Sequence, residues 1–230
     1  MAFLIPATMS QFKSSVLILG MCSLKIHLVI IVSFWLLIYN KVIHKIGGDS
    51  MLSNYIEIGI NELFNGIIMA FLMLPLLISI KFILGKRDSI TLLNTIIELS
   101  WVSMVITILL ITGIIRGKFG TTSLFNGNPV INFHLFSEGL SPATMLNMIL
   151  FIPFGFLSLI TFKKIQMNRS YGILVGFSFS CVIEILQLFT GRFVQLDDIL
   201  MNTLGSYIGY MFALYLLNFE PFKRFKLISD

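Results

Sequence analysis

Six apolar stretches, each about as long as a membrane is thick, constrain this chain more than any other feature of its sequence. A helix needs about 20 mostly apolar residues to cross a hydrocarbon core of about 30 Å. Windows of that kind occur at residues 26–43, 63–80, 96–115, 144–162, 171–190 and 199–217. Because a helix satisfies its backbone within one segment in lipid, the sequence predicts an all-α, multi-pass transmembrane bundle with about six spans.

The composition supports a membrane protein and argues against other classes. Of the 230 residues, 57% are hydrophobic and 12% are charged, whereas a soluble domain has roughly a quarter of its residues charged. The net charge of +5 does not indicate a nucleic-acid surface, because the basic residues stand in small groups between the apolar stretches. Membrane lipids are therefore the expected surroundings, and no nucleic acid is expected as a partner.

The placement of lysine and arginine predicts how the spans are oriented. With six spans and the N-terminus inside, eleven of the 16 basic residues fall in inner segments and five in outer ones. The positive-inside rule then predicts that both termini are cytoplasmic, and that residues 218–230 form a basic cytoplasmic tail.

The last three predicted spans each carry polar side chains toward their outer ends, namely Asn147, then Glu184 and Gln187, then Asn202. Residues three or four positions apart share one face of a helix. Small residues recur at that spacing on the same faces, including Gly155, Gly172, Gly176, Ser180, Ser206 and Gly209. Because small residues let helices approach closely, these faces are expected to meet one another and to direct Glu184 into the bundle.

The adjoining loops add to this polar group. Arg192, Asp197 and Asp198 lie between the fifth and sixth spans, and Asp198 is also expected as the N-cap of the sixth helix. A long segment before the fourth span contains Asn132 in an apolar stretch, which is expected to fold back into the bundle as a re-entrant piece.

Two interpretations of the polar group stay open at this point. It can be a buried network of hydrogen bonds and ion pairs that fixes helix register, with Arg192 balancing Glu184 or the aspartates. It can also be a ligand site open to the outer face, since a carboxylate inside a membrane is costly and marks function by default. A carboxyl group in a low-dielectric surrounding can act as a general acid or base, so Glu184, Asp197 and Asp198 are candidate catalytic residues.

No metal and no cofactor are expected. Carboxylate and amide oxygens would suit Mg²⁺ or Ca²⁺, but there is no tight ligand pattern, and His27, His44 and His134 are widely scattered.

Four further residues carry structural expectations. Glu62 and Glu98 fall near helix ends and are expected to reach the interface or to pair with nearby basic residues. Pro75 and Pro153 are expected to kink their helices.

Four stretches follow one another in a fixed order, namely NMILFIPFGF from Asn147, IEILQ from Ile183, GR from Gly191 and DDILMNTLG from Asp197. In this order and spacing they resemble the VanZ-like family of bacterial membrane proteins. The stretch NFHLF from Asn132 is similar to a further element of that family but has Leu135 where proline is usual. The resemblance covers residues 118–217, which are expected to be the VanZ-like core, whereas residues 1–117 are expected to form an N-terminal membrane region with about three helices.

The resemblance implies a role in the bacterial cell envelope, in the cytoplasmic membrane, because the family's namesake gives resistance to the lipoglycopeptide teicoplanin. The expected ligand is the drug, a lipid or a lipid-linked cell-wall precursor. The residues expected to bind it are Asn132, Asn147, Glu184, Gln187, Arg192, Asp197, Asp198 and Asn202. The alternative is an intramembrane enzyme that modifies a phospholipid or a lipid-linked peptidoglycan precursor. A transporter is less favoured, since the motif-bearing half is not repeated.

Overall fold

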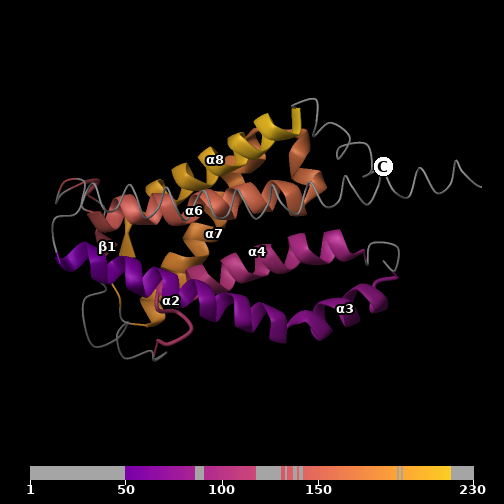
Figure 1. The fold of residues 1–230 in the computed structure, drawn as a ribbon. Helices are drawn as coiled ribbons and strands as arrows, with labels where there is room; N and C mark the ends of the chain where they lie inside the picture. Colours follow the sequence, from indigo (N-terminus) through magenta and orange to yellow (C-terminus); the bar gives the residue numbers. More distant parts are fainter. Residues whose placement is uncertain are drawn as a thin grey trace, which may run out of the picture. The chain divides into compact units, whose positions relative to one another are not determined.

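The computed structural model describes residues 50–85, 91–117, 131–132, 134–136, 139, 142–190, 192 and 194–218. Its elements in chain order are α2 (Ser50–Leu72), α3 (Leu74–Ile83), α4 (Leu92–Ile111), β1 (Ile131–Asn132), α6 (Pro142–Thr161), the 3-10 helix η2 (Lys163–Met167), α7 (Ser170–Phe189), β2 (Val194–Gln195) and α8 (Leu196–Asn218) (Figure 1). The part from Glu57 onward forms one compact unit, which contains all the contacts discussed below.

Four of the described helices are long and apolar enough to cross a membrane, namely α4, α6, α7 and α8. The Glu57–Leu72 part of α2 and helix α3 pass the same test as a pair bent by 43°, which makes a fifth span if the pair crosses as one. The prediction of an all-α bundle with several spans is therefore confirmed for the described residues. The predicted first span at 26–43 and both chain termini lie outside them.

The predicted span at 63–80 is broken between α2 and α3, where Met73 separates the two helices (Figure 1). Pro75 stands at the start of α3, where its missing N–H leaves no hydrogen bond unmade, whereas further along a helix its ring would clash with the preceding turn. The expected kink at Pro75 is thus confirmed. Pro153 lies inside α6, which continues past it as a single helix.

Helix α4 begins and ends four residues earlier than the predicted span at 96–115. At its start, the Thr91 side chain accepts a hydrogen bond from the backbone N–H of Asn94 at 3.3 Å, which caps the helix. At its end, Gly113 has a φ of 75°, a left-handed conformation that glycine adopts without strain and that stops a helix.

Helices α6 and α8 are in contact through their backbones. A Cβ atom added to Gly155 would lie 1.9 Å from the Ser206 carbonyl oxygen, and one added to Gly209 would lie 1.8 Å from that of Ile152. At Gly205 the corresponding distance is 2.0 Å, to the carbonyl oxygen of Met148. Only glycine fits at these positions, so the expectation that the small-residue faces meet one another is confirmed.

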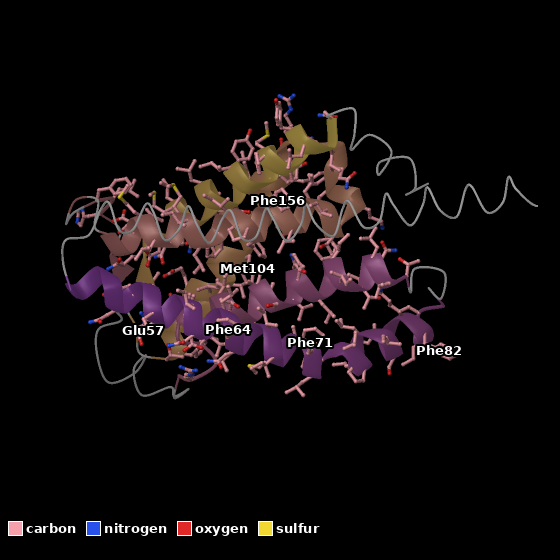
Figure 2. All side chains as sticks on the ribbon, in the orientation of Figure 1. Glu57, Phe64, Phe71, Phe82, Met104 and Phe156 are labelled. Atoms are coloured by element: carbon pink, nitrogen blue, oxygen red, sulfur yellow. The ribbon has the colours of Figure 1, made fainter. Side chains whose placement is uncertain are left out.

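Helix α4 packs against the C-terminal half of α6 and the residue that follows it through a hydrogen bond and an aromatic contact. The indole Nε1 of Trp101 donates to Ser158 Oγ at 2.9 Å, and the Trp101 ring meets that of Phe162 edge-on at 4.9 Å. Met104 and Phe156 are buried, whereas Phe64, Phe71 and Phe82 on α2 and α3 are exposed (Figure 2). Exposed aromatic side chains of this size on apolar helices suit a surface that faces lipid.

Two ion pairs join α2 and α3 to α4 and to the residues that follow it. Arg116 donates to both carboxylate oxygens of Glu62, and Lys81 lies 2.6 Å from Glu98. The expectation that Glu62 and Glu98 pair with nearby basic residues is therefore confirmed.

Candidate functional site

The polar residues predicted from the sequence gather where α7 ends and α8 begins. Glu184 on α7 is only 3% exposed. Its Oε2 accepts the backbone N–H of Gln195 in β2 at 3.3 Å, and it lies close enough to Asp198 and Arg192 to interact with their charges. We call Asn147, Glu184, Asp197, Asp198 and Asn202 the polar cluster.

The two aspartates of the polar cluster have different partners. Both carboxylate oxygens of Asp197 accept the backbone N–H of Phe136, at 2.8 and 3.0 Å. Asp198 Oδ1 accepts the side-chain amide of Asn147 at 2.7 Å, which joins α8 to α6. The expectation that Asp198 is the N-cap of its helix is wrong, because α8 begins at Leu196 and both aspartates lie in its first turn. Negative charge is favourable there because the helix dipole is positive at that end.

The segment before α6 reaches the polar cluster through its backbone. Ile131 and Asn132 in β1 pair in parallel with Val194 and Gln195 in β2. Since Gln195 also donates to Glu184, the two strands lie beside the buried carboxylate. Of Asn132, the structure describes only the backbone, which is part of this pairing.

Gln187 and Arg192 meet at the end of α4 and make no direct contact with the carboxylates. Gln187 Nε2 and Arg192 Nη1 both donate to the carbonyl oxygen of Thr112, at 3.3 and 2.5 Å. A cation is favourable at a helix C-terminus, where carbonyl groups are left without partners. The sequence did not single out Thr112, although a threonine followed by glycine is a recognisable helix ending.

The expected ion pair between Arg192 and an acid of the cluster is not formed. Within the described residues, salt bridges occur only at Lys81–Glu98 and Arg116–Glu62. The hydrogen-bonding part of that interpretation holds, because Glu184, Asp197 and Asp198 each accept a bond from a neutral N–H group.

Below the acids, α7 and α8 face each other in matched steps of four residues. Asn202 Nδ2 donates to Ser180 Oγ at 3.0 Å. A Cβ atom added to Gly176 would lie 2.5 Å from Ser206 Cβ, and one added to Gly172 would lie 2.6 Å from the Tyr210 ring. The steps run in opposite directions along the two helices, which are therefore antiparallel, with polar groups of α8 along their interface.

Two polar atoms on this face have no hydrogen-bond partner among the described residues. They are Asn202 Oδ1 and Ser206 Oγ, one turn apart on side chains that are 3% and 1% exposed. Unpaired buried polar groups are uncommon in native structures because they are costly. The interface between α7 and α8 thus contains a buried carbonyl oxygen and a buried hydroxyl group that could each form a further hydrogen bond.

A metal centre is not visible in the described part of the chain. No group of three or more His, Cys, Asp or Glu residues there is arranged to hold a metal ion.

The fold and the polar cluster define a multi-span membrane protein with buried carboxylates at one end of its helix bundle. The chain matches the family model described as VanZ/LLP1 over residues 66–218 and belongs to that family. No curated protein and no solved structure matches it.

The family match begins well before the motif-bearing region and includes α3 and α4. The structure offers a reason, because Thr112 at the end of α4 supplies the carbonyl oxygen that Gln187 and Arg192 share. Helix α4 is therefore part of the same packing unit as the motif-bearing helices.

Proposed function

We propose that this chain is a cell-envelope protein of the bacterial cytoplasmic membrane that protects against teicoplanin through its polar cluster. Both termini are cytoplasmic in this proposal, so the polar cluster faces outward. Its ligand is a lipid-attached molecule in the outer leaflet, either the drug, a membrane lipid or a lipid-linked wall precursor. Membership of the VanZ/LLP1 family supports the link to the envelope.

The observation that carries the proposal is the carboxylate of Glu184, which is 3% exposed on a membrane-spanning helix and has no ion-pair partner among the described residues. A charged side chain at the centre of a span raises the free energy of membrane insertion by about 2.5–3.5 kcal/mol. A neutral glutamine could accept the same N–H from Gln195, so holding β2 does not require a carboxyl group. A ligand that binds the carboxyl group would offset the cost of placing it in the span.

The remaining hydrogen-bonding groups of the site favour a ligand that carries donors. Glu184 and Asp198 are acceptors when ionised, and Asn202 Oδ1 is a buried acceptor without a partner among the described residues. Arg192 is exposed and uses one nitrogen on Thr112, so its other N–H groups can meet an anionic part of the same ligand. A head group with hydroxyl or amine donors and a nearby phosphate or carboxylate fits this arrangement.

The test compares teicoplanin susceptibility of a Gram-positive host that carries an empty vector, the wild type, Glu184→Gln or Glu98→Gln. Glu98→Gln is the matched control, since it removes the same charge from an ion pair with Lys81 away from the polar cluster. Membrane levels of each protein are measured by immunoblot. We expect protection by the wild type and by Glu98→Gln, and susceptibility at the vector level for Glu184→Gln. Full protection by a normally expressed Glu184→Gln variant would exclude this site, and no protection by the wild type would exclude the teicoplanin role.

Lipid and wall-precursor profiles of the same strains separate binding from catalysis. We expect the profiles of wild type and Glu184→Gln to be the same, because binding leaves no product. A lipid or precursor species that appears only with the wild type would replace this proposal with the intramembrane enzyme.

The orientation is tested by cysteine labelling in a chain whose Cys22 and Cys181 are replaced by alanine. We expect Leu135→Cys to react with a membrane-impermeant maleimide in intact protoplasts, and Lys164→Cys to react only after lysis. Both positions are exposed and lie at opposite ends of α6. The reverse pattern would place the polar cluster on the cytoplasmic side.

A further inference from the structure

Residues 131–132 and 134–136, which we call the strap, are attached at two points, to β2 and to the first turn of α8. Ile131 and Asn132 pair with Val194 and Gln195. A few residues later, the backbone N–H of Phe136 donates to both oxygens of Asp197 at 2.8 and 3.0 Å. Asp197 is 9% exposed, so this bond to a carboxylate forms where water competes little.

The second attachment point holds an unusual backbone conformation. Phe136 has a φ of 53°, and no other non-glycine residue in the described part of the chain has a positive φ. For a bulky side chain the left-handed region is disfavoured by roughly tenfold or more in equilibrium constant, whereas glycine enters it freely. A bond from the N–H to a charged acceptor is strong enough to offset a penalty of that size.

The strap is connected to Glu184 through one strand. Gln195, the partner of Asn132 in the strand pair, donates its own N–H to Glu184 Oε2 at 3.3 Å. The position of the strap and the surroundings of the buried carboxylate are therefore linked by consecutive hydrogen bonds.

We propose that Asp197 is a positioning residue, whose carboxylate holds Phe136 in the left-handed conformation and thereby keeps the strap against β2 beside Glu184. Asp197 acts through the strap and does not itself contact the ligand. The inference rests on the proposed function only in that the closed strap shapes the ligand site; the closure itself is measured independently of resistance.

We call the strap closed when β1 is paired with β2. Closure is measured by the yield of a disulfide between Ile131→Cys and Val194→Cys, in a chain whose Cys22 and Cys181 are replaced by alanine. These two residues are Cα partners in the strand pair. Neighbouring strands are about 4.8 Å apart, which falls within the range that a disulfide spans. Full-length protein in native membranes is oxidised briefly, and the cross-linked fraction is read from a gel after specific cleavage between the two cysteines.

Asp197→Asn is the first variant, because it keeps the shape of the side chain and removes its charge. We expect it to lower the closure constant about tenfold. Adding Phe136→Gly is expected to restore the yield, since glycine adopts a positive φ without strain. Adding Phe136→Ala is the matched control, because it also removes the ring but retains the penalty, and it is expected not to restore the yield.

Three results would overturn the inference: an unchanged yield in Asp197→Asn, no restoration by Phe136→Gly, or equal restoration by Phe136→Ala. The same substitutions, without the introduced cysteines, are then tested for teicoplanin susceptibility. Protection that follows closure across the set supports both proposals. Closure that behaves as expected while the wild type gives no protection contradicts the proposed function and leaves the role of Asp197 in place.

Discussion

The contact between α6 and α8 predicts that Gly209→Ala destabilises the protein, although alanine is the better helix former. The added Cβ would lie 1.8 Å from the carbonyl oxygen of Ile152, 2.8 Å from its carbonyl carbon and 2.9 Å from the backbone nitrogen of Phe156. Non-bonded heavy atoms pack best at about 3.5 Å, so the two helices must separate by roughly 1.7 Å at this point. The obstructing atoms belong to a helix backbone and cannot turn aside.

The magnitude follows from two opposing effects. Overpacking a close contact costs about 1–3 kcal/mol, and a backbone obstacle places this case near 3. Replacing glycine by alanine inside a helix contributes about 1 kcal/mol in the other direction. We therefore expect a net loss of about 2 kcal/mol in the free energy of unfolding, which is roughly a 30-fold change in the folding constant.

The assay is reversible unfolding by SDS in mixed micelles, followed by circular dichroism. Ser178→Thr serves as the control, because it adds one methyl group at an exposed position of α7, and we expect it to change stability by less than about 0.5 kcal/mol. If Gly209→Ala unfolds at the same SDS fraction as the wild type, or at a higher one, α6 and α8 are not in backbone contact and the reasoning is refuted.

Three other substitutions give independent checks. Ser158→Ala removes the acceptor of the Trp101 indole, and we expect a loss of about 1 kcal/mol in SDS unfolding together with a shifted tryptophan emission; an unchanged spectrum and midpoint would contradict the bond. Arg116→Ala leaves the buried Glu62 without its cation, and we expect a loss of about 1–2 kcal/mol, reduced by the exposure of the arginine, that Glu62→Gln on top of it largely restores. Pro75→Leu permits α2 and α3 to join, so spin labels on the two helices should move farther apart than in the wild type; an unchanged distance distribution would mean that proline is not what maintains the bend.

The positions of the spans were predictable because lipid leaves the backbone few choices. Helices α6, α7 and α8 begin within a few residues of the predicted windows, since a long apolar run in lipid must be helical. The break at Met73 was harder to place, because a proline can either kink a helix or begin the next one, and only the packing decides.

The members of the polar cluster were also predictable, whereas their partners were not. Glu184 and Asn202 are conspicuous because polar side chains are rare in spans. Asp197 and Glu184 accept the backbone N–H groups of Phe136 and Gln195, respectively. Every non-proline residue carries such a group, so no side-chain pattern marks these partners. For the same reason, the sequence suggested an arginine as the partner of the acids, whereas Asp197 and Glu184 have main-chain donors and Asp198 has the side-chain amide of Asn147.

The matched faces of α7 and α8 have a consequence for how the protein enters the membrane. Helix α8 has two aspartates in its first turn and carries Asn202 and Ser206 further along. It is the least apolar of the four described helices that are long enough to span a membrane. Alone in lipid, each of these groups would oppose insertion, the aspartates most strongly. Helix α7 supplies Ser180, which accepts the Asn202 amide, and Gly176, which lets Ser206 approach closely. Both compensating contacts form only when α7 is present. During biogenesis, α8 is therefore expected to leave the translocon together with α7 as a helical hairpin, so that α8 would fail to insert in a full-length chain whose α7 sequence is scrambled.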